Sequence, residues 1–543
     1  MRGAGVTVAA ADNLLNQAIG LHKAGDVRGA IRAYEKFLKK ASQHPGALNL
    51  LGLAYFQDGK PARAVPYLQR ALALQPDLPG ASFNLGIVLQ KMERYEEAIA
   101  CFEKAIAAEP RDADAHNAMA SALKSLGRKS EAKTHFEQAV ALGPDQPYAH
   151  FNLAKLLYEL HDYKGAREHY AKAMALGLPP ADAKMATLFL AYTLAILGSH
   201  DEAERMFDRV IADPKDDEQS HNAKLSKGVM YLALGQFAQG WPLNESRYFS
   251  QTPDPLEGLA PPWNGEAITG PLLVRAEQGL GDEIIYASMI SDLQKRVPSI
   301  VLEAEPRLVE MFARSFPGAR IVARGSDLSQ EQVTAQIRCG SLGIFLRPDW
   351  DSFKTPERGY LVADAGRAAE LRRRLSTDRR KVVGLSWRSV SPNMGPTKTA
   401  RLIDFLPVLR LPGIRFVDLQ YGDTAEERAE LEREAGIAVA HLDNIDNTKD
   451  IEGLAALMQA CDAVLSVSNT NAHLAGALGR PTWVLVPFGY AKIWYWFKGQ
   501  KKSPWYPHVQ VRHRAEGQSW QDLLSQISVE FAESISAIRS EAG

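Results

Sequence analysis

The first half of the chain repeats itself with a period of 34 residues. Blocks that begin at Pro45, Pro79, Ala113 and Pro147 share one pattern of small and apolar residues. A helix pair that cannot bury its apolar face alone must stack on neighbouring pairs, and small residues let paired helices approach closely. The period therefore predicts an α-solenoid. The shared small residues are Gly52, Gly86, Ala120 and Ala154 at the eighth place, Ala64, Ala98, Ala132 and Ala166 at the twentieth, and Ala71, Ala105, Ala139 and Ala173 at the twenty-seventh.

This pattern resembles the tetratricopeptide repeat. Residues 11–44 fit a degenerate first copy, and two looser copies follow, one around Leu190 and one around Gly228. We therefore assign residues 11–248 to the solenoid. Because such a solenoid has a concave groove suited to an extended peptide, the resemblance predicts an arm that docks a protein. A spacer or an oligomerisation arm is the alternative.

The sequence changes character after residue 248. Residues 249–269 are rich in proline and predict a linker. From Pro271 onward, short apolar runs such as "PLLVRAE", "SIVLEAE", "ARIVAR", "KVVGLSW", "RFVDLQYG", "AVLSVS" and "TWVLVP" alternate with helical patterns. Such runs predict parallel sheets covered on both faces. We expect two Rossmann-like α/β domains, residues 270–375 and 376–543, that face each other across a cleft.

Charge and cysteine content exclude several classes of protein. Lys and Arg number 63 against 64 Asp and Glu, which argues against a nucleic-acid or membrane-surface binder. Cys101, Cys339 and Cys461 lie far apart, so they predict no zinc site and fit a reducing compartment. The sequence has no signal-peptide pattern and no apolar run of about 18 residues. We expect a cytoplasmic protein without membrane insertion, metal or resident cofactor.

The stretch "LLVRAEQGLGDEIIYAS" predicts a strand, a turn with Gly279 and Gly281, and a helix. Such a turn commonly cradles a phosphate, but Asp282 and Glu283 stand at the helix start and would repel one. Ile284 replaces the third glycine of the dinucleotide fingerprint, which argues against a nicotinamide or flavin. Two roles stay open for Asp282: a helix cap, or a general base that takes a proton from an attacking hydroxyl.

Two segments together carry a family resemblance. "LLVRAEQGLGDEIIYASMISDL" and "VLSVSNTNAHLAGALGRPTWVLVP" resemble the paired signatures of the heptosyltransferase-like branch of GT-B glycosyltransferases. With the repeats in front, the chain resembles bacterial repeat-bearing glycosyltransferases, including those implicated in flagellin glycosylation, and more distantly the nucleocytoplasmic O-linked N-acetylglucosamine transferases. The resemblance implies metal-independent transfer from a nucleotide sugar. It also implies that Asp282 is the base, with Glu283 beside it, and that Gly279 and Gly281 face the acceptor.

The resemblance puts the donor in the C-terminal domain, where protein groups must stabilise its phosphate. In "GLSWRSVSPNMGPTKTARL", Arg388 and Lys398, the latter beside Thr399, are expected to offset charge on the leaving group. Solvated loop cations are the alternative. In "SVSNTNAHLAGALGRP", the turn from Ser468 to Thr470 is expected to cap a helix and to form an anion site.

Four further residues complete the predicted donor site. Asn469 lies in the same polar turn, and His473 follows one helical turn later, where it would bind phosphate or sugar or simply pack. Gln420 and Tyr421 follow another strand and would hold the base and ribose. Ser468 replaces the aspartate that opens this motif in the heptosyltransferases, which argues against a heptose donor.

Aromatic residues concentrate near the C-terminus. Trp494, Trp496, Trp505 and Tyr506 are expected to form either a wall on which a sugar stacks or a buried cluster. The sequence has no acidic triad with metal-ligand spacing, no GxSxG turn and no Walker loop, which argues against metal-dependent hydrolysis, acyl transfer and ATP use.

Two classes of function fit these features. The first is a glycosyltransferase that moves a sugar, with a CMP-nonulosonic acid as the leading hypothesis, to Ser or Thr hydroxyls of a protein. Flagellin is the expected protein, and a lipopolysaccharide or small-molecule acceptor is the alternative. The second is a non-catalytic scaffold in which the repeats bind a partner and the GT-B portion has lost turnover.

Overall fold

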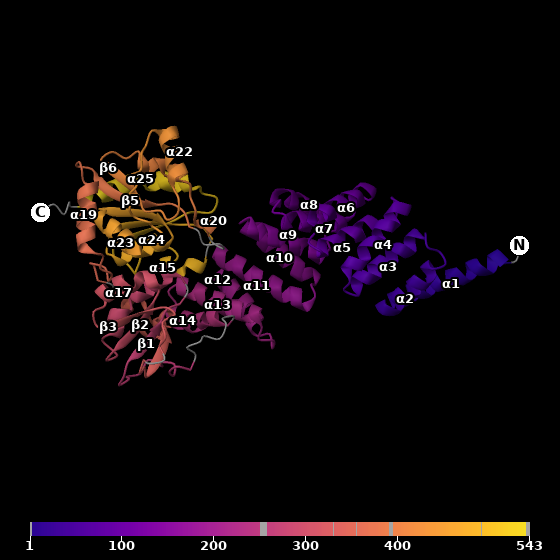
Figure 1. Ribbon diagram of the computed structural model, residues 1–543, viewed down its shortest axis with the longest axis horizontal. Coiled ribbons are helices and arrows are strands. Elements are labelled where there is room, and N and C mark those ends of the chain that lie inside the picture. The colour runs from indigo at the N-terminus through magenta and orange to yellow at the C-terminus, as the bar shows by residue number, and fades with distance from the viewer. Residues whose placement is uncertain are drawn as a thin grey trace. The chain divides into compact units, whose positions relative to one another are not determined.

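The structure, a computed structural model, divides into two compact units, Met1–Val210 and Ile211–Gly543. Each unit is a folded body with its own architecture (Figure 1). The residues that the structure describes are 3–249, 258–277, 279–328, 331–354, 356–389, 395–489 and 491–538.

The first unit is a stack of antiparallel helix pairs, as the repeat predicts. Turns between paired helices use glycines with positive φ, among them Gly25, Gly59 and Gly127, where other residues would be strained. Its helices are α1 (Gly3–Lys23), α2 (Val27–Leu38), α3 (Pro45–Gln57), α4 (Pro61–Leu74), α5 (Ala81–Lys91), α6 (Tyr95–Ala108), α7 (Ala113–Ser125), α8 (Lys129–Leu142), α9 (Pro147–Glu159), α10 (Tyr163–Leu176), α11 (Pro180–Leu197) and α12 (His200–Ile211).

Close approach within each pair explains the small residues of the repeat. A Cβ added at Gly86 would lie 2.5 Å from Cε1 of Phe102, and one at Gly52 would lie 2.6 Å from Cγ of Leu68. The alanines of the twentieth place are fully buried between the helices, whereas Ala105, of the twenty-seventh place, is half-buried. The prediction of closely packed helix pairs is confirmed.

One helix of this unit, α11, is long and apolar enough to cross a membrane by length and composition alone. It contains Asp182 and Lys184 near its start, so it is not an uninterrupted run of apolar residues. In the structure α11 packs against α10 and α9 in the repeat stack. Its buried residues include Leu190, Ala191 and Leu194, which lie in the interior of the stack.

The last helix pair belongs to the second unit, so the predicted solenoid of residues 11–248 crosses the boundary between units. The pair consists of α13 (Glu218–Ala233) and α14 (Phe237–Asn244), followed by η1 (Glu245–Tyr248). Aromatic contacts tie it to the α/β part: the ring of Trp241 lies 5.2 Å from that of Trp494. Because long-range packing sets this boundary, the repeat pattern alone does not reveal it.

The first sheet of the second unit has the strand order β3-β2-β1-β4, and all its strands are parallel. The apolar runs predicted β1, β2 and β3, but β4 escaped prediction because its sequence "AQIR" has little apolar character. Around this sheet lie β1 (Leu272–Arg275), α15 (Leu280–Ala287), α16 (Ile290–Leu293), β2 (Ile300–Ala304), η2 (Pro306–Leu308), α17 (Val309–Ser315), β3 (Ala319–Ala323), β4 (Ala335–Arg338), η3 (Cys339–Leu342), α18 (Gly343–Leu346) and η4 (Trp350–Ser352).

Part of the predicted linker packs on this sheet. Pro262 pairs with Gln336 of β4, and the backbone N–H of Trp263 donates to the Gln336 carbonyl at 2.8 Å. The Trp263 side chain is buried. The description of residues 249–269 as a linker is therefore wrong for this stretch, whereas residues 250–257 lie outside the described part.

The second sheet has the order β6-β5-β7-β8-β9, again with parallel strands. Val383 and Leu385 of β5 face α21 and α25, while Val382 faces α23, so the sheet is covered on both faces as predicted. Its elements are α19 (Ala365–Leu375), β5 (Lys381–Ser386), α20 (Gly395–Lys398), η5 (Leu402–Phe405), α21 (Leu406–Leu409), β6 (Ile414–Asp418), α22 (Ala425–Ala435), α23 (Ile451–Ala460), β7 (Ala463–Val467), α24 (Thr470–Ala477), β8 (Thr482–Val486), η6 (Ala491–Trp496), β9 (Val509–His513) and α25 (Trp520–Ala537).

We call the parts of the second unit that surround the first and the second sheet the N-terminal and the C-terminal lobe. The position of α19 shows that the two lobes divide at a different point from the predicted domain boundary. α19 falls within residues 270–375, yet it packs on α23 of the second sheet, where Arg372 pairs with Asp462 at 2.9 Å. The domain change therefore comes before α19 rather than after it.

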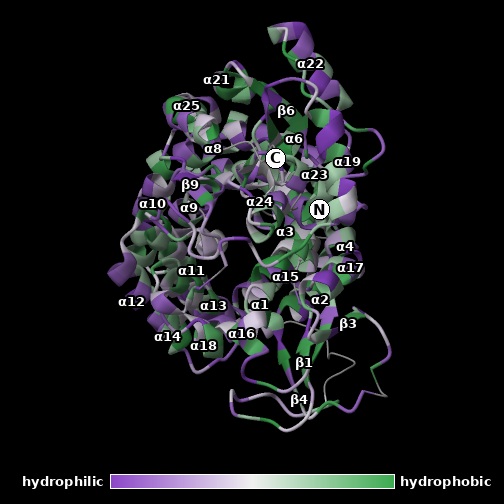
Figure 2. Ribbon diagram, turned by 90° about the vertical axis from the view of Figure 1, so that its left-hand side faces the viewer, coloured by the Kyte–Doolittle hydropathy of each residue, from purple (hydrophilic) through white to green (hydrophobic). Residues whose placement is uncertain are grey.

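α22 carries mostly charged residues and buries Leu431 alone among its described side chains, in contrast to the apolar strands (Figure 2).

We expect Gly86→Ala to destabilise the repeat unit. The new methyl group would overlap the buried Phe102 ring, and overpacking costs about 1–3 kcal/mol, which exceeds or matches the helix propensity gain of about 1 kcal/mol. Thermal unfolding followed by circular dichroism measures the change. Gly20→Ala in α1 is the matched control, because nothing lies within 4 Å of its new Cβ, and it should raise the midpoint. A Gly86→Ala protein as stable as this control would contradict the close approach.

Candidate functional site

Two short helices from the two lobes of the second unit meet at their N-termini. α15 follows β1, and α24 follows β7, so both start at the carboxyl ends of parallel strands. A Cβ at Gly281 would lie 3.3 Å from Cδ2 of His473 and 3.5 Å from Oγ1 of Thr470. The structure thus brings together the two segments that carry the resemblance, and the missing side chain at Gly281 leaves room for their approach.

Asp282 stands at this junction. Its Oδ2 accepts the backbone N–H of Gly279 at 3.3 Å, which caps α15. Burial raises the pKa of Asp282 to about 6, while the Gly279 N–H and the charge of Lys398 in the opposite lobe act to lower it. The two roles considered for Asp282, a helix cap and a general base, are therefore compatible. The carboxylate that caps α15 is also influenced by the charge of Lys398, which belongs to the other lobe.

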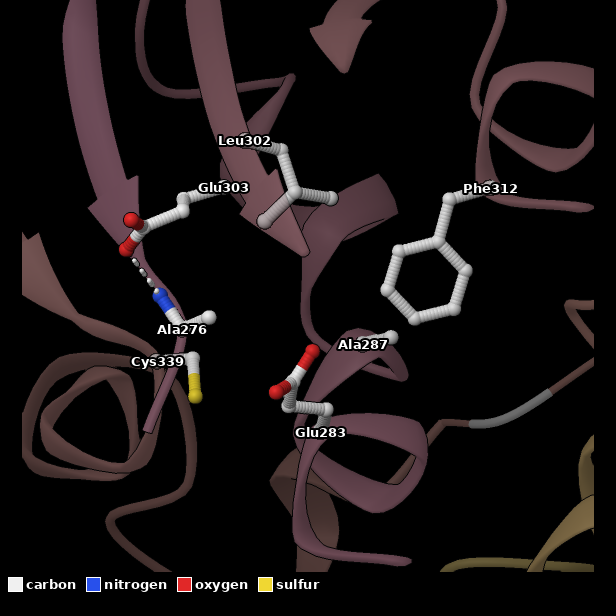
Figure 3. A pocket seen from close by; sticks show the side chains of 7 residues that line it. All are labelled: Ala276, Glu283, Ala287, Leu302, Glu303, Phe312 and Cys339. Atoms are coloured by element: carbon white, nitrogen blue, oxygen red, sulfur yellow. Dashed lines mark hydrogen bonds between the residues drawn. The ribbon is translucent and has the colours of Figure 1, made fainter. Parts of the chain in front are cut away.

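Glu283 points elsewhere. Its side chain accepts the backbone N–H of Glu305 at 2.8 Å and pairs with Arg324 inside the N-terminal lobe. Figure 3 shows it beside Glu303 and Cys339 in a small pocket of that lobe. Burial raises the pKa of Glu283 to about 7. Glu283 is therefore a packing and pairing residue, and its assignment as a second base is wrong.

Lys398 is the cation that faces Asp282. It is buried, and burial lowers its pKa to about 8, while the charge of Asp282 acts to raise it. Its neighbour Thr399 supports the loop: Oγ1 accepts the backbone N–H of Ser389 at 3.1 Å and donates to the Ser389 carbonyl. Lys398 thus remains a candidate for a phosphate contact, whereas Thr399 is occupied by the backbone.

Arg388 was expected to offset charge on the leaving group, but its guanidinium is engaged within the protein. It pairs with Glu427 at 2.6 Å and donates to the Asp423 carbonyl at 2.5 Å. Gln420 accepts the backbone N–H groups of Trp387 and Arg388, each at 2.9 Å. Tyr421 donates its hydroxyl to the Arg388 carbonyl at 3.1 Å. These three residues brace the ends of β5 and β6, which corrects their assignment as donor ligands.

The polar turn before α24 is largely occupied by internal bonds. Ser468 accepts the indole N–H of Trp496 at 2.7 Å. Asn469 caps α24 by accepting the N–H groups of Asn471 and Ala472 at 3.0 and 3.4 Å. The expected cap is present, but it uses amides that an anion would need. Thr470, which lies against Gly281, is the residue of this turn that faces the other lobe.

The aromatic residues near the C-terminus form a buried cluster. Trp496, Trp505 and Tyr506 are each 0% exposed and Trp494 is 6% exposed, so no wall for sugar stacking exists in this set. Of the two interpretations of these residues, the buried cluster is confirmed.

A buried charged cluster beside the turn escaped prediction. Glu277, just after β1, accepts hydrogen bonds from Arg247 at 3.1 Å and from Tyr248. Both of these residues lie in η1, at the end of the last repeat. Glu277 raises and Arg247 lowers the pKa of Asp282. No sequence spacing joins residues 247 and 277, so the cluster was not visible before the structure.

The described residues include no group of three or more His, Cys, Asp or Glu side chains that could hold a metal ion. The candidate site consists of Asp282, Lys398, Thr470 and His473, which come from both lobes of the second unit. Gly279 and Gly281 shape the turn that carries the first of them.

Comparison with known proteins supports the repeats. Tetratricopeptide repeat models match residues 50–122 and residues 15–79, 117–183 and 151–217. Protein FlbA of Caulobacter vibrioides is 29% identical over 363 residues, which are 62% of this chain and 59% of that protein. The chain thus contains tetratricopeptide repeats within residues 15–217, and its C-terminal part contains two parallel α/β sheets. It is similar to FlbA over a segment that spans less than two thirds of that relative.

Two solved structures are similar to part of this chain. MamA from Desulfovibrio magneticus RS-1 is 28% identical, with a TM-score of 0.29, over 31% of this chain and 94% of that one. PilW, a type IV pilus biogenesis factor, is 20% identical, with a TM-score of 0.36, over 39% of this chain and 96% of that one. At such TM-scores the likeness supports no comparison of function.

We expect Asp282→Asn to stabilise the protein in a pH-dependent way. Burial raises the pKa of Asp282 from 3.8 to about 6, so its contribution to stability is full below about pH 4 and is lost as the pH rises through 6. Asparagine stays neutral and keeps the cap. The variant should gain on the order of 1 kcal/mol at pH 7.5, and the gain should vanish near pH 4.

Calorimetric unfolding at pH 4, 5, 6 and 7.5 measures this gain. Asp77→Asn, at an exposed position of the repeats, is the control and should change the midpoint little at any of these pH values. An Asp282→Asn protein that is no more stable than wild type at pH 7.5 would show that the carboxylate is not buried.

Proposed function

We propose that this protein is a cytoplasmic glycosyltransferase that moves a sugar from a nucleotide-activated donor to Ser or Thr hydroxyls of a protein. The observation that carries the proposal is the junction of two helix N-termini from the two lobes, where the charges of Asp282 and Lys398 act on each other. The family resemblance of the two signature segments supplies the reaction class, and flagellin is the proposed acceptor on the same ground.

In this reaction the acceptor oxygen attacks the anomeric carbon, the bond between that carbon and the phosphate oxygen breaks, and the nucleotide leaves. Asp282 takes the proton of the acceptor hydroxyl; a pKa of about 6 suits a base that works near neutral pH. Lys398 and the Thr470 hydroxyl offset the charge that develops on the leaving phosphate. Because Gly281 lies against Thr470, the acceptor side and the donor side adjoin.

The charge of the site favours a donor with one phosphate. Among the described side chains of the opposite lobe, Lys398 is the cation whose charge acts on Asp282. Arg388, the other cation expected at the donor site, is paired with Glu427. A CMP-linked sugar carries one negative charge on its phosphodiester, whereas a nucleoside diphosphate sugar carries two. A single buried ammonium balances the first better than the second. The phosphate charge thus favours a CMP-linked donor, and the resemblance to flagellin glycosyltransferases makes a nonulosonic acid, which adds one carboxylate charge, the proposed sugar.

The repeats would hold the protein acceptor. Their first helices adjoin one another, α3 with α5, α5 with α7 and α7 with α9, and so form the inner layer of the stack. On this layer Asn84 donates to Asn49, and Asn152 donates to Asn117, each at 3.0 Å. Each amide keeps further donor or acceptor capacity that suits the backbone of an extended peptide.

A non-catalytic scaffold is the competing function, and one observation favours it. Arg388, Gln420 and Ser468 of the predicted donor site are all engaged by internal bonds. A thermal-shift screen with CMP, UDP and GDP and their sugar conjugates separates the two functions, since a ligand at 100 times its dissociation constant adds about 2.7 kcal/mol. A response to no nucleotide would favour the scaffold.

We expect Asp282→Asn to lower transfer by roughly 10²- to 10⁴-fold, because the variant lacks the base. Donor binding should stay near normal, since the phosphate contacts lie in the other lobe. Glu283→Gln is the matched control: that side chain lies inside the N-terminal lobe, so transfer should persist. Rates are measured with labelled donor and purified acceptor. Full transfer by Asp282→Asn would refute its role as base.

We expect removal of residues 1–210 to abolish transfer to a protein while sparing transfer to a small acceptor. The cut follows the boundary between the units and keeps α13 and α14, which pack on the α/β part. Loss of both activities would point to misfolding, which the unfolding midpoint of the shortened protein reveals. Retention of protein glycosylation would contradict the docking role of the repeats.

An unchanged glycan mass on flagellin from a strain without the protein would remove flagellin as acceptor.

A further inference from the structure

Glu277 is a buried carboxylate just after β1, and both of its oxygens are engaged. Arg247 donates from Nε to Oε2 and from Nη2 to Oε1, each at 3.1 Å. The Tyr248 hydroxyl donates to Oε2, and the backbone N–H of Gly340 donates to Oε1, each at 2.5 Å. We call these four residues the Glu277 cluster. Because a forked arginine contact and two further donors hold it, the carboxylate has a fixed position.

The cluster joins the end of the last helix pair of the repeats to the helix that carries Asp282. Arg247 and Tyr248 lie in η1, directly after α14, and Gly340 lies in η3, after β4. A Cβ added at Gly340 would lie 2.9 Å from Nη2 of Arg247 and 3.1 Å from Cε2 of Tyr286. Tyr286 follows Asp282 by one turn of α15. The end of the repeats and α15 therefore pack on the same point of η3.

The turn between β1 and α15 is held from both sides. Glu277 anchors its start, two positions before Gly279. The N–H of Gly279 donates to Oδ2 of Asp282 at 3.3 Å, and Tyr286 packs beside Gly340 one helical turn further on. A displacement of Glu277 would therefore shift the N–H that caps α15, and with it the carboxylate of Asp282.

Stability alone does not explain a buried ion pair at this place. Removing two charges from water costs about as much as their attraction returns, so apolar side chains of similar size would hold the fold as well. Fixed charges next to an ionisable group, by contrast, set its charge state. Burial raises the pKa of Asp282 to about 6, with the charge of Glu277 also raising it and that of Arg247 lowering it. The cluster thus acts on Asp282 through both position and charge.

We propose that the Glu277 cluster is a positioning device for Asp282: it fixes the turn before α15 and makes the action of the base depend on the last helix pair of the repeats. This inference rests on the proposed function, in which Asp282 takes the proton of the acceptor hydroxyl. Glu277, Arg247 and Tyr248 are then positioning residues. The last helix pair belongs to the reacting part of the protein rather than to the docking arm, which agrees with the unit boundary at Val210.

Glu277→Gln separates charge from shape, because glutamine keeps the size of the side chain while Arg247 keeps its charge and its partner Glu245. Without the carboxylate that raises it, the pKa of Asp282 should fall. The acidic limb of the pH profile of kcat/KM follows the base of the free enzyme, so we expect it to move to lower pH by up to about one unit. Glu310→Gln, at an exposed position of the same lobe, is the control and should leave this limb in place.

Tyr248→Phe removes one hydrogen bond of the cluster and no charge. We expect kcat to fall about 3- to 10-fold, the value of one hydrogen bond, with the KM for the donor and the acidic limb unchanged. An unchanged acidic limb in Glu277→Gln, or a full kcat in Tyr248→Phe, would overturn the inference and leave the proposed function intact. If Glu277→Gln does not fold, Tyr248→Phe decides alone.

A second measurement needs no transfer. Calorimetric unfolding at pH 7.5 gives the stabilisation by Asp282→Asn in the wild-type and in the Glu277→Gln background. We expect a smaller gain in the second, because the pKa of Asp282 is raised less without the charge of Glu277. Equal gains would overturn the inference whether or not the protein transfers a sugar. If the wild type transfers no sugar from any donor, the proposed function fails, and the two gains then decide the coupling of Glu277 to Asp282 by themselves.

Discussion

The candidate site depends on the close approach of two helix N-termini at Gly281. α15 and α24 each start where a parallel strand ends, and the absence of a Cβ at Gly281 lets the first helix touch Thr470 and His473 of the second. Two positive helix ends and the buried Lys398 would be unfavourable together without a counter-charge. Asp282 supplies that charge, and the same burial raises its pKa toward the range of a useful base.

Most of the polar residues near this junction serve to hold it rigid. Gln420 satisfies the backbone after β5, Arg388 is neutralised by Glu427, and Asn469 caps α24. Internal hydrogen bonds of this kind hold the polar groups of a site in fixed positions. Stabilisation of a transition state requires such fixed polar groups. Among the residues that the structure describes, a small set of side chains therefore remains available for ligands, and this set includes Asp282 and Lys398.

Local patterns predicted much of the fold. The 34-residue period gives the helix pairs, and apolar runs mark the strands that are buried on both faces, such as β5 and β7. Strands β4 and β9 were missed because their short sequences, "AQIR" and "VQVRH", contain polar residues and form no apolar run, whereas the other two edge strands, β3 and β6, have more apolar sequences and were predicted. The place of α19 and the unit boundary at Val210 depend on contacts between distant segments, which no local period reports.

The sequence by itself determined that a helix begins after a strand at a glycine turn with two carboxylates. It also determined that a second helix begins after another strand at a polar turn. Only the tertiary structure decided which carboxylate serves the junction. Adjacent residues on a helix point about 100° apart, so Asp282 and Glu283 cannot share an environment. Glu283 meets Glu305 and Arg324 within its own lobe. Asp282 meets the charge of Lys398, a residue more than a hundred positions away, because the packing of two lobes brings them together.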